Sequence, residues 1–222
     1  MRPSTVAPIP ATSTPPVPYV TSLAWAEAQL GHAEELLVEQ AHLEKKAAAS
    51  AVQFLFRIPG GIASHRDLSV LAREELVHFE RTLRLLAQRG IGFAPQPPSD
   101  YAGKLKAACA TVMPQRLVDE LLVAAVIEAR SHERLLLLAA AFAATDPELA
   151  AFYADLAAAE SRHAPTYLEV AELVVPATEV QERYARMLAH EAMVLAALPF
   201  APRLHSGWPS PPSPPQSERA HG

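Results

Sequence analysis

Cysteine is nearly absent from this chain of 222 residues, which contains Cys109 alone. A single thiol excludes an intramolecular disulfide framework and any metal site built from several cysteines. Proteins without disulfides are typical of reducing compartments. The sequence therefore predicts a cytoplasmic protein.

Glycine and aromatic residues are also scarce, because the chain has 8 glycines and its Phe, Trp and Tyr residues make up only 6% of it. Half of the residues are hydrophobic, with alanine and leucine prominent, and the 21 prolines gather mainly at the two ends and in one internal loop. This composition is typical of an all-α protein.

A net positive charge is missing as well, since the formal net charge is −5. The chain therefore lacks the overall basic field of many proteins that bind nucleic acids or anionic membranes. Any RNA partner must be held by a local basic patch.

Long uninterrupted apolar runs are missing too. The most apolar stretch, 121–144, is interrupted by Glu128, Arg130, His132, Glu133 and Arg134. It therefore predicts a buried helix, and we expect no membrane span. The N-terminal residues lack the apolar region of a secretory signal peptide.

The proline-rich ends divide the chain into a leader at 1–20, a helical domain at 21–200 and a tail at 201–222. The leader and the tail are predicted to be disordered or irregular. Hydrophobic periodicity and helix-end signals predict helices over about 21–57 with a break near Gly31, 64–89, 100–110, 115–143, 147–174 and 179–197.

Several residues predict where these helices begin and end. Ser64 is expected to be an N-cap, and Gly90 has the position of a C-terminal glycine. Asp146 followed by Pro147 is a strong start signal. Pro165 lies inside a predicted helix, which we expect it to kink or loosen.

Two Glu-x-x-His pairs, Glu75 with His78 and Glu160 with His163, lie in the helical segments. Residues three apart share one face of a helix. The face that carries the first pair is otherwise mostly apolar, with Leu68, Leu71, Thr82 and Leu85. A carboxylate and an imidazole turned into a core need a partner there.

Two single glutamates complete the pattern, because Glu44 and Glu128 each interrupt an apolar stripe. Glu44 precedes Glu75 by 31 residues, and Glu128 precedes Glu160 by 32. Each half of the chain therefore has a Glu on one helix and a Glu-x-x-His pair on the next. This is the ligand set of a carboxylate-bridged di-iron four-helix bundle.

Four carboxylates and two imidazoles suit iron or manganese better than a structural zinc ion. A single Glu-x-x-His pair is more often an exposed pair on a helix surface. The symmetric set of six argues against that alternative.

Other acidic and histidine residues lie off these faces. Glu39 and His42 form a third Glu-x-x-His pair, but at ~100° per residue they lie about 140° and 160° around the helix from Glu44. We expect both to face solvent. Glu74, which precedes Glu75, is expected to point aside.

Three residues are weaker candidates for the surroundings of the site. His132 follows Glu128 by four, so it is either an extra ligand or a histidine bonded to another partner. Tyr167 follows His163 by four and either lines a cavity or belongs to the core. Tyr101, at the end of a proline-rich loop, is a further pocket candidate.

A local basic mouth is the other candidate feature. It would consist of the basic side chains of Lys45, Lys46, Arg57, Lys104, Lys106, Arg116 and Arg203. The alternative is that these side chains lie on solvated faces of the helices.

The residues around the predicted ligands resemble the MiaE family of tRNA hydroxylases over roughly 36–207. The strings that carry the resemblance are Glu44-Lys-Lys-Ala-Ala, Leu71-Ala-Arg-Glu-Glu-Leu-Val-His-Phe-Glu80, Arg116-Leu-Val-Asp119, Ile127-Glu-Ala-Arg-Ser-His-Glu-Arg134, Glu160-Ser-Arg-His163 and Leu204-His-Ser-Gly207.

The resemblance implies a ferritin-like fold and a non-haem di-iron monooxygenase. Such an enzyme would use O2 to hydroxylate the isopentenyl group of 2-methylthio-N6-isopentenyladenosine in the tRNA anticodon loop. The family's iron ligands map onto the six residues chosen above, Glu44, Glu75, His78, Glu128, Glu160 and His163. An external electron donor, such as a ferredoxin with its reductase, is implied because no flavin, haem or iron–sulfur motif is present. We expect a monomer or a dimer.

Other functions remain open at this point. One is a di-iron oxygenase or oxidase that acts on another small apolar substrate. Another is iron handling of the ferritin or rubrerythrin kind, although the lone cysteine excludes a rubredoxin-type site. The third is a metal-free helical interaction module.

Overall fold

The computed structural model describes residues 20–208. Within this range the chain has no strand, and a 3-10 helix, η1 (Leu30–His32), lies between the first two α-helices. The α-helices are α1 (Leu23–Glu27), α2 (Ala33–Leu55), α3 (Ile62–Gln88), α4 (Tyr101–Lys106), α5 (Gln115–Phe142), α6 (Pro147–Glu172) and α7 (Ala177–Ala197). Apart from Val20, the predicted leader lies outside the described residues, as does the tail beyond 208.

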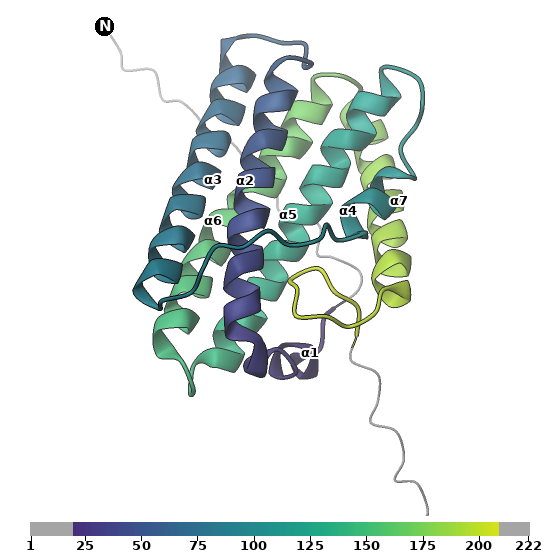
Figure 1. Ribbon diagram of the computed structural model, residues 1–222. Coiled ribbons are helices and arrows are strands. Elements are labelled where there is room, and N and C mark those ends of the chain that lie inside the picture. The colour runs from purple at the N-terminus through teal and green to yellow at the C-terminus, as the bar shows by residue number, and fades with distance from the viewer. Residues whose placement is uncertain (1–19, 209–222) are drawn as a thin grey trace, which may run out of the picture.

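Four long helices, α2, α3, α5 and α6, run side by side (Figure 1). α2 packs on α3 and α5 packs on α6, while α7 and the short α4 lie against α5. The segment between α3 and α4 crosses over α2 (Figure 1). This arrangement confirms the predicted ferritin-like four-helix bundle with an additional C-terminal helix. Among residues 20–208, no helix combines the length and the apolar character that a membrane span requires.

The ends of the helices follow local chemistry. The Asp146 carboxylate accepts a hydrogen bond from the Leu149 amide at 3.0 Å and caps α6, as predicted. Gly90 has a φ of +68° directly after α3, which is the left-handed conformation expected at that position. The prediction for Ser64 is wrong, because α3 begins at Ile62 and the Ser64 hydroxyl donates to the Gly61 carbonyl.

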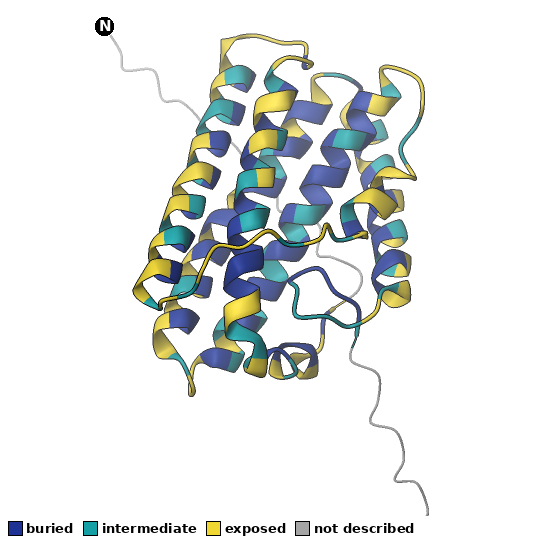
Figure 2. Ribbon diagram, in the orientation of Figure 1, coloured by how far each residue is buried: buried dark blue, intermediate teal, exposed yellow. Residues whose placement is uncertain are grey.

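Two hydrophobic clusters occupy different parts of the bundle along its axis. On α2, Leu37 and Ala41 belong to one cluster, and Ala51 and Phe54 to the other. Figure 2 shows that α5 is buried along most of its length. Each of the four bundle helices passes from one cluster to the other across a stretch that contains the predicted metal ligands. A buried polar layer therefore separates the two clusters.

The chain after α7 folds back onto the bundle. The Arg134 Nη1 donates to the carbonyls of Leu204 and Ser206 at 2.6 and 2.8 Å, and Leu204, His205 and Ser206 are buried. Residues 201–208, which the composition groups with the tail, have no helix but are packed against the helical domain. We call residues 199–208 the C-terminal segment.

Candidate metal centre

Each helix of the bundle contributes to one buried cluster of acidic and histidine side chains. Glu44 comes from α2 and Glu128 from α5, while α3 and α6 each supply one Glu-x-x-His pair. The structure thus brings together all six predicted ligands, each at most 5% exposed, which are Glu44, Glu75, His78, Glu128, Glu160 and His163.

The six side chains form two overlapping groups. Glu44 and His78 belong to the first group, Glu128 and His163 to the second, and Glu75 and Glu160 to both. In each group, one potential ligand atom per residue lies within 4.8 Å of the others. The geometry therefore suits two neighbouring metal ions with two carboxylates between them.

Unpartnered polar atoms in the cluster show that it fits metal ions. The two carboxylate oxygens of Glu75 and the Nδ1 of His78 are buried and form no well-aligned hydrogen bond with the described residues. The closest polar atom is the His163 Nδ1, which lies 2.7 Å from one Glu75 oxygen. The His78 Nδ1 lies 3.7 Å from a Glu44 oxygen and 3.8 Å from a Glu75 oxygen. Buried polar groups are rarely left without a partner, so the chemistry of these atoms fits a site that holds a cation.

The charges of the cluster lead to the same conclusion. Burial raises the pKa of the Glu128 carboxyl well above its ordinary value, and the negative charges of Glu160 and Glu75 raise it further. Burial lowers the pKa of His78, but the neighbouring carboxylates of Glu44 and Glu75 outweigh burial and raise this pKa to about 9. Two divalent cations would balance four ionised carboxylates and leave both imidazoles neutral, as ligands must be.

Two further polar residues support the candidate ligands from outside the cluster. The Gln40 side-chain amide donates to a Glu44 oxygen at 2.6 Å. The Nε2 of His163 lies 3.0 Å from a Glu74 oxygen, while its Nδ1 faces Glu75. The expectation that Glu74 points aside is therefore wrong, because it orients His163 with Nδ1 towards the cluster.

The prediction that Glu39 faces solvent is also wrong. Glu39 is only 4% exposed and accepts a hydrogen bond from the Leu204 amide at 2.5 Å. Its side of α2 is covered by the C-terminal segment, which helix periodicity does not reveal. Burial raises the pKa of the Glu39 carboxyl to about 7, although the Leu204 amide and nearby Arg203 act in the opposite direction. His42 is half-buried, and its Nε2 lies 2.8 Å from the Ala94 carbonyl oxygen.

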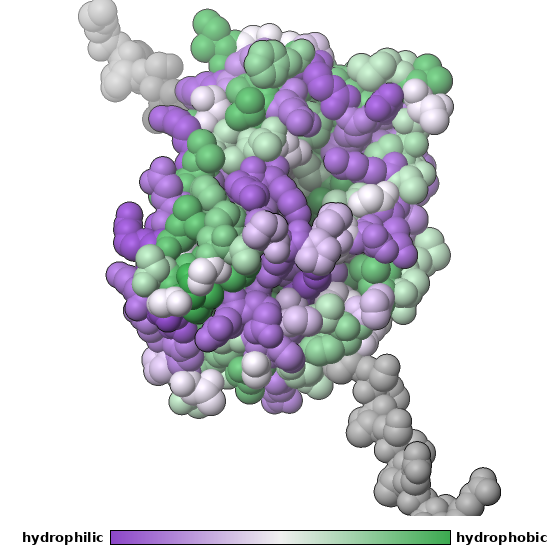
Figure 3. Space-filling model, viewed as in Figure 1, coloured by the Kyte–Doolittle hydropathy of each residue, from purple (hydrophilic) through white to green (hydrophobic). Residues whose placement is uncertain are grey.

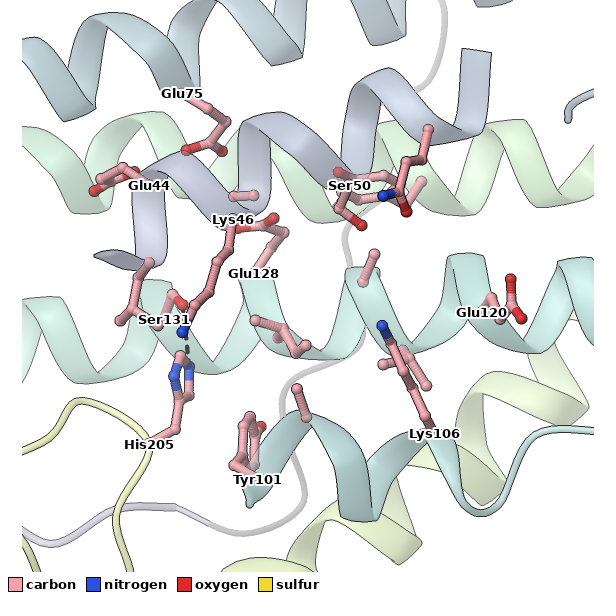
Figure 4. Close-up of a pocket in the computed structure, with 18 of the residues that line it drawn as sticks. Glu44, Lys46, Ser50, Glu75, Tyr101, Lys106, Glu120, Glu128, Ser131 and His205 are labelled. Atoms are coloured by element: carbon pink, nitrogen blue, oxygen red, sulfur yellow. Dashed lines mark hydrogen bonds between the residues drawn. The ribbon is translucent and has the colours of Figure 1, made fainter. Parts of the chain in front are cut away.

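A cavity of about 530 Å³ opens next to the cluster, and carboxylates from all four bundle helices line it (Figure 4). Tyr101 and Tyr167 also line it, as predicted for pocket residues. His132 does not, because its Nδ1 lies 2.8 Å from the Ala157 carbonyl oxygen. His132 therefore corresponds to the alternative of a histidine bonded to another partner.

Only part of the predicted basic mouth lies at the cavity. Lys46, Arg57, Lys106 and Arg116 line it. Lys45 instead lies over the Phe93 ring, and Lys104 and Arg203 are also absent from the lining. Hydrophilic side chains gather on this face of the molecule (Figure 3). The cavity thus joins a buried carboxylate cluster to a partly basic surface.

Sequence reasoning missed two polar residues in the cavity wall, Ser131 and His205. The only signal for His205 was the string Leu204-His-Ser-Gly207, which helix periodicity cannot interpret because it lies outside the helices. The sequence also gave no indication of the buried ion pair of Arg130 with Glu191. In this pair the Arg130 Nε and Nη2 donate to the Glu191 carboxylate at 2.7 and 2.8 Å.

Fold and site together define a ferritin-like helical bundle with a buried carboxylate–histidine centre. The family model for tRNA-(MS2IO6A)-hydroxylase, MiaE, matches residues 17–206. The chain belongs to this family.

Two curated relatives are both named tRNA 2-(methylsulfanyl)-N(6)-isopentenyladenosine(37) hydroxylase. The protein of Pseudomonas putida is 36% identical over 186 residues, which cover 84% of this chain and 89% of the relative. The protein of Salmonella typhimurium is 33% identical over 141 residues, which cover 64% of this chain and 51% of the relative.

A solved structure is also similar to this chain. It is described as Protein 43 with aldehyde deformylating oxygenase activity from Synechococcus. It has a TM-score of 0.79 and 39% sequence identity, and the match covers 86% of this chain and 96% of that one.

Proposed function

We propose that this protein is an O2-dependent di-iron hydroxylase of the isopentenyl group of 2-methylthio-N6-isopentenyladenosine in tRNA. The observation that carries this proposal is the cluster of six candidate ligands, whose four glutamates line the cavity, in a chain of the MiaE family. The names of both curated relatives support the choice of substrate. Modification of tRNA also agrees with the predicted cytoplasmic location.

Two iron ions would be held by the six residues named above, with Glu75 and Glu160 between them. When bound, they would supply the activation of O2, so that one oxygen atom enters a C–H bond and the other leaves as water, with two electrons and two protons from outside. A ferredoxin with its reductase is the class of donor we propose.

Apolar residues of the chain line part of the cavity. Leu43, Phe54 and Val123 give it an apolar lining suited to a prenyl chain, and Ala124 leaves room for one. Tyr167 also lines it and is fully buried. Ala48 and Ala125 are buried but lie outside the lining.

The basic residues of the cavity would hold the RNA backbone. Arg57 and Arg116 both pair with Glu120, so part of their charge is already balanced. Lys46 and Lys106, in contrast, make no ion pair with any residue in 20–208. Lys106 is exposed and available for a phosphate group, whereas the Lys46 side chain reaches towards Ser131 and His205 at the cavity wall (Figure 4). Backbone contacts of this kind make binding depend on salt.

A second candidate function is the O2-dependent deformylation of an aldehyde, because the similar Synechococcus structure is described with aldehyde deformylating oxygenase activity. A neutral aldehyde needs an apolar cavity and a metal centre but no basic mouth. Lys46, Arg57, Lys106 and Arg116 at the cavity therefore favour an anionic polymer as the substrate.

The test begins with iron per chain and the optical spectrum of the purified, oxidised protein. We expect two irons per chain. The loaded enzyme is then given reductant, O2 and either tRNA carrying the modified nucleoside or a long-chain aldehyde, and the products are identified by mass spectrometry. A hydroxylated nucleoside supports the proposal. Turnover of the aldehyde alone would assign the second function, and a protein that takes up no Fe(II) would exclude both.

A further inference from the structure

Ser131 occupies a distinctive place in the cavity wall. It lies one turn after Glu128 on α5, on the same side of the helix, and it is 7% exposed. Figure 4 shows its side chain facing His205, with Lys46 reaching towards the same place. The Ser131 Oγ lies 3.2 Å from the Nε2 of His205.

His205 is neutral and is held in one orientation. Burial lowers its pKa to about 3, and the positive charges of Arg134 and Arg130 add to this effect. A hydrogen bond to the Ile127 backbone acts in the opposite direction, as expected when an imidazole N–H donates to a carbonyl. A neutral imidazole has only one N–H. We assign it to Nδ1, towards the Ile127 backbone, so that the Nε2 that faces Ser131 is the acceptor.

This arrangement determines the direction of the Ser131 hydroxyl. Because Nε2 of His205 accepts, the hydroxyl hydrogen of Ser131 points towards His205. The oxygen of Ser131 then presents only lone pairs to the cavity. A hydroxyl that donates a hydrogen bond also becomes a stronger acceptor for a second one. The wall therefore selects a ligand that carries an N–H or O–H donor.

The C-terminal segment is built to hold His205 in place. The imidazole stacks on the Tyr101 ring, with centroids 4.6 Å apart and planes at 7°. The Tyr101 hydroxyl donates to Glu191 at 3.0 Å. At Gly207, a Cβ would lie 1.7 Å from the Leu198 carbonyl oxygen, so only glycine fits. Several independent contacts thus serve the position of one side chain.

We propose that Ser131 accepts a hydrogen bond from the N6–H of the alkylated adenine, and that His205 is the positioning residue that directs the Ser131 hydroxyl. This inference rests on the proposed function and names the group that recognises the substrate. The distances along α5 and along the prenyl chain agree with this placement of the substrate. Ser131 and Glu128 are three residues apart, a rise of about 4.5 Å along the helix. An extended prenyl chain spans about 5 Å from N6 to its terminal carbon at ordinary bond lengths. With N6 at Ser131, the terminal carbon reaches the level of the metal centre.

The experiment uses two anticodon stem-loop RNAs. One carries 2-methylthio-N6-isopentenyladenosine, and the other carries the 6-isopentenyloxy analogue, in which an oxygen replaces the N6–H. The iron-loaded wild type is compared with Ser131→Ala and with Ser69→Ala, a control on α3 away from the cavity. The steady-state kcat/KM, the iron content and the far-UV circular dichroism are measured for each.

We expect Ser131→Ala to lower kcat/KM about 5- to 150-fold on the N6–H substrate, the range for a hydrogen bond that leaves its partner unsatisfied. On the oxygen analogue, Ser131→Ala and the wild type should have equal kcat/KM, because neither can make the hydrogen bond. Ser69→Ala should match the wild type on both RNAs. An equal loss on both RNAs, or no loss on either, would overturn the assignment of Ser131.

His205→Phe tests the positioning role, because it keeps a ring against Tyr101 and removes the acceptor for the Ser131 hydroxyl. We expect this variant to keep its iron and to lose most of the preference for the N6–H substrate. Full wild-type preference would show that His205 does not direct Ser131. A wild-type enzyme that holds two irons but hydroxylates neither RNA would overturn the proposed function itself, which is a different result from either failure above.

Discussion

Single carboxylates in the cluster differ in how many metal positions they serve. Glu75 and Glu160 belong to both groups of candidate ligands, whereas Glu128 belongs to one. We therefore expect Glu75→Ala to lose both irons and Glu128→Ala to fall towards one iron per chain, with hydroxylation lost in both variants. Iron is measured by a colorimetric assay and helical content by circular dichroism.

Glu169→Ala is the matched control, since Glu169 lies on α6 and is exposed. It should keep two irons and full activity. A Glu128→Ala protein with two irons and normal turnover would contradict the ligand assignment.

Glu39 gives a residue-scale prediction about pH. Its folded-state pKa of about 7 lies above the ordinary glutamate pKa of 4.5, so the folded protein binds the proton more tightly than the unfolded chain does. Ionisation of Glu39 therefore costs stability as the pH rises from about 4.5 to 7, by roughly 3 kcal/mol at ~1.4 kcal/mol per pKa unit. Glu39→Gln should be more stable than the wild type at pH 8 and equally stable below pH 4.5. Urea unfolding at both pH values measures this difference, and an equal difference at both would contradict it.

The sequence identified the candidate ligands because each one interrupts an apolar stripe, as Glu44 and Glu128 do. It could not identify Glu39, Ser131 or His205. Their surroundings depend on how the C-terminal segment folds back across α2 and α5, and this contact between distant parts of the chain has no periodic signature.

At the scale of whole elements, the C-terminal segment depends on Gly207. Gly207→Ala places a Cβ against the Leu198 carbonyl. We expect the segment to shift, at a cost of about 1–3 kcal/mol in the free energy of unfolding. Activity on tRNA should fall while both irons stay bound, because none of the six ligands belongs to this segment. Thermal unfolding and an iron assay test this.

Gly31→Ala is the matched control, because a Cβ at Gly31 meets no atom within 4 Å. Its unfolding temperature should equal that of the wild type. A Gly207→Ala protein with unchanged stability and turnover would show that the segment has more freedom than its packing suggests.

The α5–α7 contact contains a fully buried ion pair between Arg130 and Glu191. A buried charge that loses all its partners typically costs about 3–5 kcal/mol. Arg130 also pairs with Glu133, so Glu191→Ala should lower the free energy of unfolding by less than this amount and release the Tyr101 hydroxyl. Glu182→Ala, at an exposed position on the same helix, should have little effect. Urea unfolding of both variants decides between these outcomes.

Most elements were predictable from the chain itself. The sequence predicted α6 from Asp146 and Pro147, and the end of α3 from Gly90. It misplaced the start of α3 because Ser64 has the chemistry of a cap, whereas the chain enters this helix at Gly61 without any side-chain cap.

At the scale of the whole molecule, the cavity joins a negative interior to a positive rim. If Lys46 and Lys106 hold RNA phosphates, the logarithm of the binding constant should fall steeply with the logarithm of the salt concentration. Replacing both with alanine should reduce this slope by about 1.4–1.8, since each neutralised phosphate contributes roughly 0.7–0.9. Fluorescence anisotropy with labelled tRNA at several salt concentrations gives the slope.

Arg84→Ala, at an exposed position on α3, is the control for the loss of one positive charge. It should leave the slope unchanged. A double lysine variant with the wild-type slope would place the RNA on another surface.

The division of the ligands between two hairpins also concerns how the molecule is made. The α2–α3 hairpin leaves the ribosome first and carries Glu44, Glu75 and His78, which make only half of the cluster. Glu160 and His163 follow about 80 residues later, at the end of the second hairpin. Neither metal position is complete before α6 has emerged and docked. A pair of metal ions held by all six candidate ligands would therefore require both hairpins to have folded and docked.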